Sequence, residues 1–441
     1  MFKRSLWPWW LTLLGIWGLS TYADRLWLAA DLRLPAWDQA DYLNNALDHG
    51  RSLGFLGGDG WHGWTALLDL SPKIPPLSPL VSATVMALAG EQVDAASWVL
   101  SLWHGVLLLS VGLWGRQLLN PSFGLLSAAL TALAPAIAGI RVDFTLDMPV
   151  TATCGLALWL LWRWHRPHLG GQWSQALLAA VAIGAAILVK QSALLVIAPP
   201  AVWELLRSHN KPTRRRQGFA ALTLVITMLL PWLHHNWITT LGGTERAVIR
   251  SGMQEGDPGI LDPRSVIWYP ALWLQQLGAT TLIGGIGGLT ILARKARHQT
   301  HKAWSEDWGW LLGVTISGWI FISLSPNKDP RYILPILPLM IILLARGWWE
   351  IGSIIRNRYG FRWTICSLAA GLCSSALICL HAATGTIQRQ PRLAATQAIE
   401  ALSKRVGKKH TTLLTSADKP DLNEHTLTFL GQTEGRRIKA R

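Results

Sequence analysis

Long apolar segments recur along most of the chain, and short polar connectors separate them. Most have about 17–23 residues, which is enough for a helix to cross a bilayer. The expected spans are residues 7–23, 97–118, 121–139, 147–165, 173–189, 191–206, 217–237, 270–293, 307–324, 331–349 and 361–382. This pattern predicts an all-α polytopic membrane protein of about eleven transmembrane helices, of which the first is an uncleaved span rather than a signal peptide.

Residues 77–90 are also apolar, but this segment is short and contains serine, threonine and proline. If it were a span, the later arginine-rich connectors would lie on the outer side, against the positive-inside rule. We therefore expect an interfacial helix here, with Pro75 and Pro76 at its start, inside a first outer loop of residues 24–96.

The net charge of +15 does not indicate a nucleic-acid partner, because half of the residues are hydrophobic and only 15% are charged. The basic residues cluster between apolar segments, where they meet anionic lipid headgroups and set the orientation. The connectors expected on the cytoplasmic side contain Lys3 and Arg4, Arg116, Arg163 and Arg166, residues 207–216, residues 294–302 and residues 346–362. The pattern predicts a multi-pass protein of the cytoplasmic (inner) membrane with a cytoplasmic N-terminus.

The character of the chain changes after residue 382. Residues 393–405 and 421–430 are expected to be helices, and residues 411–415 a short strand. We therefore divide the chain into a membrane domain, 1–382, and a small outward-facing appendage, 383–441, that is too short to bury much core alone.

Polar motifs collect in the connectors that the same rule places outside. They are Asp38 and Asp41 with Tyr42, Lys73 in K-x-P-P-L, Asp143 and Asp147 in R-x-D-x-x-x-D-x-P, Lys190 at a short turn, and Arg331 and Tyr332 in R-Y-x-L-P-x-x-P. Charged groups beside a membrane are costly unless they face water or take part in chemistry. Their convergence on one side indicates a reaction at the membrane surface.

This order of motifs resembles the GT-C membrane glycosyltransferases of the protein O-mannosyltransferase (dolichyl-phosphate-mannose-protein mannosyltransferase) and aminoarabinose-transferase type, over roughly residues 1–382. The resemblance implies a GT-C bundle with interfacial helices in the first outer loop. It also implies a sugar donor carried on a polyprenyl phosphate, and single displacement with inversion at the outer face of the membrane. The acceptor class stays open between protein, lipid and glycan.

The resemblance assigns roles to particular residues. Asp38 would accept the proton of the acceptor hydroxyl, and Asp147 would position the acceptor or Lys73. Lys73 and Arg331, with Tyr332 beside it, would bind the donor phosphate.

Four further residues are candidates for the same site: Asp41, Tyr42, Asp143 and Lys190. Gln39 stands where the family normally has Glu, which removes a negative charge and weakens the case for a bound divalent metal. No metal ligand and no certain cofactor are predicted.

Simpler interpretations stand beside these roles. Asp38 could cap a helix over residues 39–49, and Lys73 could be a snorkelling interfacial lysine. Asp143 and Asp147 would share one face if their segment were helical. GGIGG (284–288) lies inside an expected span and favours a close helix-packing surface over a nucleotide loop.

Two other functions remain alternatives. A secondary transporter or lipid flippase would predict internal repeats and ionisable groups at mid-membrane, and the sequence shows neither clearly. A non-catalytic scaffold that binds polyprenyl phosphate is the other. The large outer loop, 238–269, is expected to cover the site and contribute to acceptor choice.

Overall fold

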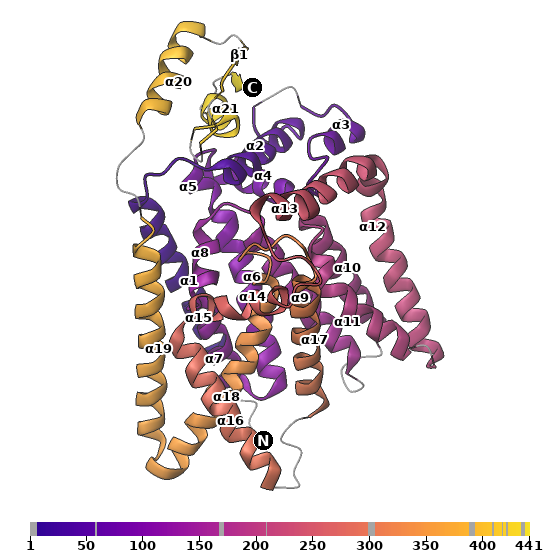
Figure 1. Ribbon diagram of the computed structural model, residues 1–441, viewed down its shortest axis with the longest axis vertical. Coiled ribbons are helices and arrows are strands. Elements are labelled where there is room, and N and C mark those ends of the chain that lie inside the picture. Colours follow the sequence, from indigo (N-terminus) through magenta and orange to yellow (C-terminus); the bar gives the residue numbers. More distant parts are fainter. Residues whose placement is uncertain are drawn as a thin grey trace.

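The computed structural model describes residues 7–57, 60–166, 172–208, 210–298, 305–387, 393–407, 410–416, 418–419, 422–433 and 437–441. Helices make up nearly all of the regular structure in these ranges, and the described strands form one short parallel pair, β1 with β2. Long helices run along the vertical axis of Figure 1, and shorter elements cover the upper end. The all-α fold predicted from the sequence is confirmed.

The elements occur in the following order. The helices of the bundle are α1 (Trp7–Ala30), α6 (Trp98–Leu118), α7 (Pro121–Ala132), α8 (Pro135–Val142), α9 (Asp147–His165), α10 (Trp173–Val189), α11 (Ala193–Ser208), α12 (Pro212–Glu245), α16 (Ala279–His298), α17 (Glu306–Ser323), α18 (Leu337–Tyr359) and α19 (Phe361–Thr384). The first connector, residues 31–97, contains α2 (Trp37–Ser52), α3 (Trp64–Asp69), α4 (Leu77–Ala89) and α5 (Val93–Ala96). A later connector contains η1 (Arg246–Arg250), α13 (Ser251–Glu255), α14 (Arg264–Trp268), η2 (Pro270–Leu272) and α15 (Trp273–Leu277), and η3 (Leu334–Ile336) precedes α18.

Four helical stretches in the described residues are long and apolar enough to cross a membrane, or six if two bent pairs each count as one span. The four are Val93–Leu118, Pro212–Glu255, Leu334–Tyr359 and Phe361–Thr384. The chain is therefore a multi-pass membrane protein. The predicted number of about eleven spans is not confirmed, although a helix or a bent pair lies at each expected segment.

Two expected spans are broken rather than straight. The segment 121–139 bends by 63° between α7 and α8, where Pro135 opens the second helix. The segment 270–293 is wrong as a single helix, because α15 ends before Gly278 and the chain bends by 112°. Gly278 has φ +81°, which side-chain-bearing residues rarely adopt, so the turn depends on glycine. Hydropathy is continuous through both breaks and could not reveal them.

The GGIGG motif forms the predicted helix-packing surface between α16 and α18. A Cβ on Gly288 would lie 1.9 Å from the carbonyl oxygen of Gly347, and one on Gly347 would lie 2.0 Å from that of Gly285. The two backbones therefore touch directly, as small residues permit.

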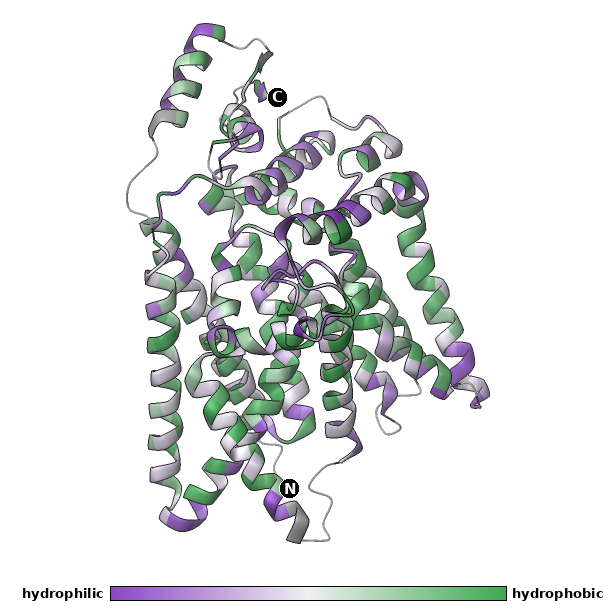
Figure 2. Ribbon diagram, in the orientation of Figure 1, coloured by the Kyte–Doolittle hydropathy of each residue, from purple (hydrophilic) through white to green (hydrophobic). Residues whose placement is uncertain are grey.

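Figure 2 shows apolar residues along the middle of the long helices and polar residues at both ends. Some tryptophans near the helix ends face the interior of the bundle rather than its surface. Trp114 and Trp162 are fully buried, and the rings of Trp114 and Trp310 lie 6.0 Å apart inside the bundle. An aromatic belt thus accounts for only part of the tryptophan content.

The expected helix over 77–90 is α4, which follows Pro76 and packs against α2 in the first connector. Leu43 and Leu47 of α2 share one buried cluster with Met86 of α4. Asp24, expected in the first outer loop, instead lies buried in α1 and pairs with Arg141. The first connector thus begins later than predicted.

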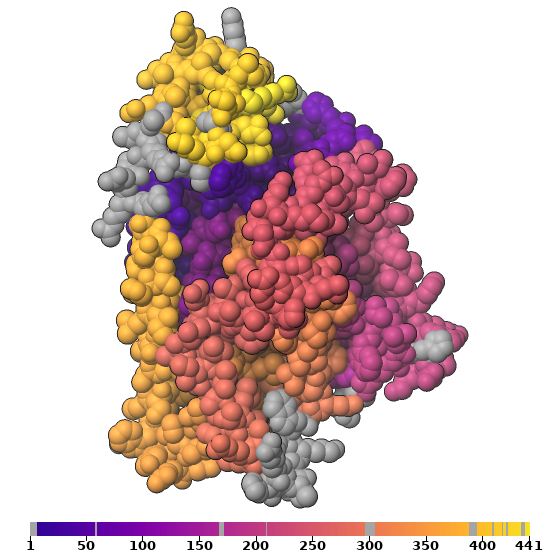
Figure 3. All heavy atoms as spheres, viewed as in Figure 1, coloured from indigo at the N-terminus to yellow at the C-terminus, as the bar shows by residue number. Residues whose placement is uncertain are grey.

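The C-terminal appendage lies over the first connector at the upper end (Figure 3). It consists of α20 (Leu393–Val406), β1 (Thr411–Leu413), α21 (Glu424–Gln432) and β2 (Ile438–Ala440). Both helices and the first strand match the prediction, whereas β2 was not expected. Ile399, Leu427 and Ile438 form its small core with Leu34 of the first connector.

Candidate functional site

Arg331 is the centre of the polar cluster beneath the first connector. It lies in the loop between α17 and η3, where its guanidinium makes a forked contact with Asp329, Nη2 to Oδ2 at 2.7 Å. Hydrogen bonding to Asp329 raises the pKa of Arg331. Burial alone would raise the pKa of Asp329, but the hydrogen bonds and charge of Arg331 lower it. The pair therefore stays ionised, and it fixes the arginine side chain.

The free end of the guanidinium meets two carboxylates from distant parts of the chain. Arg331 Nη1 lies 3.3 Å from Asp38 Oδ2 and 3.8 Å from Asp147 Oδ2. Asp38 is exposed in the first turn of α2, whereas Asp147 is buried at the start of α9. A solvent-facing acid and a buried acid thus share one cation.

Asp147 is held on its other side as well. Lys190, which follows α10, places Nζ 2.9 Å from Asp147 Oδ1, and Thr145 donates a hydrogen bond to Oδ2 at 3.1 Å. Lys190 Nζ also lies 5.6 Å from the ring centre of Tyr332. Burial raises the pKa of the Tyr332 hydroxyl to about 12, so this group stays protonated at neutral pH.

Asp143 and Asp147 do not share a helix face, contrary to the simpler interpretation. Asp143 has extended backbone after α8, and Asp147 begins α9. Gln39 instead donates a short hydrogen bond to Asp143. Burial, with the charges of Asp147 and Asp38, raises the pKa of Asp143 despite the Gln39 bond and Arg331.

Asp38 does not cap its helix. The N-cap of α2 is Ala36, whose backbone N–H donates to the side-chain oxygen of Gln39 at 3.0 Å. The side-chain hydrogen bond at the start of α2 therefore comes from Gln39 and not from Asp38. The Asp38 carboxylate stays available to the site.

Asp41 and Tyr42 follow on the same helix. Burial raises the pKa of Asp41, and the charges of His425 and Lys73 oppose this shift. His425 of the appendage places Nδ1 3.5 Å from Asp41 Oδ1. Burial also raises the pKa of Tyr42, which lines a small pocket with Ser78, Ser82, Phe144 and Pro149.

Lys73 lies apart from this cluster of acids. Its side chain is exposed, and it makes no ion pair with the residues that the structure describes. Asp147 pairs with Lys190 and not with Lys73. The ammonium of Lys73 is therefore a free cation at the rim, within electrostatic reach of Asp41.

The segment after α12 covers the loop that carries Arg331. Asn327 donates to the carbonyl of Ala247 at 2.6 Å, and Asp257 accepts from the backbone N–H of Lys328 at 2.7 Å. A Cβ on Gly252 would lie 2.7 Å from the Pro326 carbonyl oxygen. Part of the expected loop 238–269 thus continues α12 as helix and packs on the site.

Three residues near the site were not found from the sequence: Asp329, Thr145 and His425. Asp329 lies two residues before Arg331 in NKDPRY, and that proximity was the available signal. Thr145 and His425 had none, because their roles depend on contacts across the fold. Among the described residues, no group of three or more His, Cys, Asp or Glu is arranged to hold a metal ion.

Residues 73–235 match the family model described as dolichyl-phosphate-mannose-protein mannosyltransferase. The matched range is less than half of this chain. This range begins at Lys73 and includes Asp147 and Lys190. No curated protein sequence matches the chain.

Solved structures resemble the whole fold. ArnT from Cupriavidus metallidurans bound to undecaprenyl phosphate gives a TM-score of 0.64 at 16% identity, covering 99% of this chain and 85% of that one. The archaeal oligosaccharyltransferase AglB from Archaeoglobus fulgidus, in complex with an inhibitory peptide and a dolichol-phosphate, gives 0.60 at 12% identity, with 99% and 65% covered. The chain therefore has the GT-C fold, and the resemblance recognised in its motifs is confirmed.

Proposed function

We propose that this chain is an inverting glycosyltransferase that moves a sugar from a polyprenyl-phosphate donor to an acceptor hydroxyl. The observation that carries the proposal is the meeting of Arg331 with Asp38 at 3.3 Å and with Asp147 at 3.8 Å, although the three lie far apart in sequence. Ionisable groups with shifted pKa values, such as Asp143 and Asp329 near this cation, are typical of catalytic centres. The GT-C fold shared with ArnT, solved with undecaprenyl phosphate, supports this class of donor.

In the proposed reaction the acceptor oxygen attacks the anomeric carbon of the donor sugar. A carbon–oxygen bond forms to the acceptor as the bond from the sugar to the phosphate breaks. The phosphate leaves with the electron pair, and Asp38 takes the hydroxyl proton. A single displacement of this kind inverts the anomeric configuration.

Arg331 and Lys73 would neutralise the departing phosphate, each in a different manner. The guanidinium is held in a fixed orientation by Asp329, so it presents its remaining N–H groups as a directed fork. The exposed lysine supplies a mobile point charge at the rim. Together they would stabilise negative charge that develops only as the sugar transfers.

Asp147 would orient the reacting groups, and Lys190 and Tyr332 would support it from the opposite side. Asp41, Tyr42 and Asp143 would shape the acceptor side of the site. Burial raises the pKa of both Asp41 and Asp143, and the charge of Asp38 adds to each shift.

The acceptor is a protein, a lipid or a glycan, and membrane lipids surround the bundle. We infer that the covering loop, 238–269, contributes to acceptor choice, because its helical part packs on the loop that carries Arg331. We also propose the division into a transferase domain, 1–382, and an appendage, 383–441.

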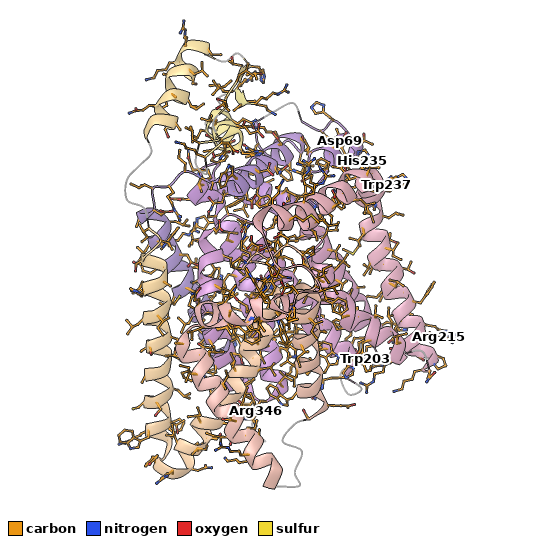
Figure 4. All side chains as sticks on the ribbon, in the orientation of Figure 1. Asp69, Trp203, Arg215, His235, Trp237 and Arg346 are labelled. Atoms are coloured by element: carbon orange, nitrogen blue, oxygen red, sulfur yellow. The ribbon has the colours of Figure 1, made fainter. Side chains whose placement is uncertain are left out.

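We further infer that the site faces away from the cytoplasm, with the N-terminus inside. Figure 4 shows Arg215 and Arg346 below the level of Asp69 and His235, so that labelled basic residues lie toward the end opposite the first connector. Cytoplasmic connectors carry the excess of Lys and Arg in membrane proteins. The upper end in Figure 1 would then lie outside the cytoplasmic membrane.

The test is sugar transfer from polyprenyl-phosphate-linked donors, in membranes that contain the wild type or Asp38→Asn at matched expression. We expect wild-type transfer with inversion, and a loss of about 10²- to 10⁴-fold in the variant, as for removal of a general base. Asp48→Asn, ten residues further along α2, is the matched control and should keep wild-type activity.

Equal transfer by wild type and Asp38→Asn would overturn the role of Asp38. Binding of polyprenyl phosphate without transfer of any lipid-linked sugar would favour the scaffold. Movement of the intact lipid across the membrane would favour the flippase.

A further inference from the structure

The short segment that carries Lys73 is held almost residue by residue from outside. Residues 68 and 69 end α3, and residues 70–73 lead on toward α4 without helix or strand structure. Four side chains donate to their carbonyl groups. The bonds are Trp232 Nε1 to Ser71 (3.1 Å), Asn236 Nδ2 to Leu68 (3.1 Å), Thr240 Oγ1 to Pro72 (3.5 Å) and Gln191 Nε2 to Lys73 (2.7 Å).

Three of the four donors form one stripe on α12. Trp232, Asn236 and Thr240 are spaced four residues apart, so they lie on one face of the helix. They are 4%, 5% and 7% exposed, although Leu230, Leu233 and Trp237 on the same stretch are well exposed. This stretch of α12 thus buries a polar stripe against the lysine segment while neighbouring apolar residues stay exposed.

A fifth contact comes from His235, the residue before Asn236 on α12. His235 Nε2 and Asp69 Oδ1 are 2.6 Å apart, and Figure 4 shows both side chains at the upper end of α12 beside Trp237. This contact joins α12 to the last residue of α3. Within the described part of the chain, every residue of 68–73 except Leu70 thus has a hydrogen bond or ion pair to α12 or to Gln191.

The segment needs support from outside because it can provide little itself. Pro72, Pro75 and Pro76 have no backbone N–H, so they cannot donate to a turn or a ladder around Lys73. Unpaired carbonyls that are shielded from water are costly. The side chains of α12 and Gln191 satisfy them, and in doing so they fix the path of the backbone that ends at Lys73.

We propose that Trp232, Asn236, Thr240 and Gln191 form a positioning clamp that sets where Lys73 presents its ammonium to the donor phosphate. The inference rests on the proposed role of Lys73 as a phosphate ligand. The clamp residues act through the backbone of the lysine segment and are positioning residues. Their effect should therefore appear in binding of the lipid phosphate and should depend on Lys73.

The experiment measures binding of undecaprenyl phosphate to the full chain in detergent, with Trp232→Phe as the variant. This change removes one N–H donor and keeps an aromatic ring. Trp237→Phe makes the same chemical change on the exposed face and is the matched control. We expect Trp232→Phe to raise the Kd about 5- to 10-fold, in the range of one lost hydrogen bond, and Trp237→Phe to leave it unchanged.

A double-mutant cycle with Lys73→Gln separates positioning from a general loss of structure. If Trp232 acts through Lys73, Trp232→Phe should change the Kd by less than about twofold in the Lys73→Gln background. The same change in both backgrounds would overturn the clamp. Gln191→Met, which removes the donor to Lys73 at nearly constant size, repeats the test if Trp232→Phe fails to fold.

The outcomes also distinguish the clamp from the function on which it rests. If Lys73→Gln leaves binding of undecaprenyl phosphate unchanged, the proposed role of Lys73 is wrong. If Lys73→Gln weakens binding while Trp232→Phe and Gln191→Met do not, the clamp alone is wrong.

Discussion

Gln39 uses both ends of its side-chain amide at the edge of the candidate site. Its oxygen accepts from the backbone N–H of Ala36, and its nitrogen donates to Asp143. An ionised glutamate at this position could cap the helix but could not donate to Asp143. The neutral amide therefore lets the partly buried carboxylate of Asp143 remain near Asp38 and Asp147.

The pKa of Asp143 leads to a prediction about stability. Burial raises this pKa in the folded protein, so the folded state binds the proton more tightly than the unfolded state does. The resulting stabilisation is complete below the unfolded pKa, about 3.9, and is lost as pH rises through the higher folded value. Asp143→Asn does not titrate, so its apparent Tm in detergent should equal the wild-type value near pH 4 and exceed it at pH 8.

The variant Asp262→Asn should show the opposite dependence of stability on pH. Hydrogen bonds from Arg264 lower the pKa of Asp262, so its stabilisation exists at high pH and disappears as pH falls. This variant should be slightly less stable than wild type at pH 8, because exposed pairs contribute little. A parallel pH response in the two variants would contradict the assignment for Asp143.

For single residues, the sequence indicated which side chains belong to the candidate site but not which groups they contact. The order of motifs was enough to select Asp38, Asp147 and Arg331, since each lies in a connector that hydropathy places on one side. Their mutual contacts depend on how α2, α9 and the α17–η3 loop pack. The sequence left Asp147 to position either the acceptor or Lys73, and the structure pairs it with Lys190 and Arg331.

Among the helices, the contact of α16 with α18 has the least room for change. Backbone atoms of Gly288 and Gly347 already touch, so even a methyl group at 288 must push the helices apart. We predict that Gly288→Ala destabilises the fold by about 1–3 kcal/mol or more, as overpacked sites do. The apparent Tm in detergent should fall by several degrees.

Gly287→Ala is the matched control. A Cβ at Gly287 has no heavy atom within 4 Å, and alanine is the better helix former. The Tm of this variant should stay at or slightly above the wild-type value. Equal losses at both positions would mean that glycine itself, rather than the helix contact, is required.

Helices were predicted well where the hydrophobic periodicity and the length of the segment both indicate a helix. They were predicted poorly where a single backbone angle breaks the helix. The helix over 77–90 and the helix over 393–405 are present close to their expected bounds. The break at Gly278 is a local backbone event inside continuous apolar sequence, which hydropathy does not register. The strand β2 is three residues long, and it becomes regular only by pairing with β1.

At the scale of the whole molecule, the appendage is joined to the helix that carries Asp38. Arg51 of α2 donates to the side-chain oxygen and the backbone carbonyl of Gln432, at 2.8 and 2.7 Å. Thr426 donates to the carbonyl of Pro35, just before α2 begins, at 2.8 Å. The appendage therefore contacts both ends of α2.

We predict that Arg51→Ala loosens this contact. Two hydrogen bonds to a charged group are lost, so amide hydrogen exchange in α21 should accelerate by about 10-fold or more. Exchange in α9, which lies in the bundle, should not change. Arg405→Ala, an exposed position on α20, is the control, and an equal acceleration there would contradict a specific role for Arg51.

One continuous helical stretch, α12 through α13, contacts the two segments that carry the proposed phosphate ligands. Residues 232–240 of α12 hold the lysine segment, and residues 247–257 pack on the loop that carries Arg331. The π-helical turn η1 (Arg246–Arg250) lies at the boundary between these zones, and such a turn amounts to one inserted residue. Each inserted residue advances a helix by about 1.5 Å and rotates the residues that follow by about 100° about the helix axis. η1 therefore sets how residues 247–257 are rotated about the helix axis relative to residues 232–240. Inserting or deleting one residue between 240 and 247 would turn one of these contact zones away from its partner segment while the other stays in place.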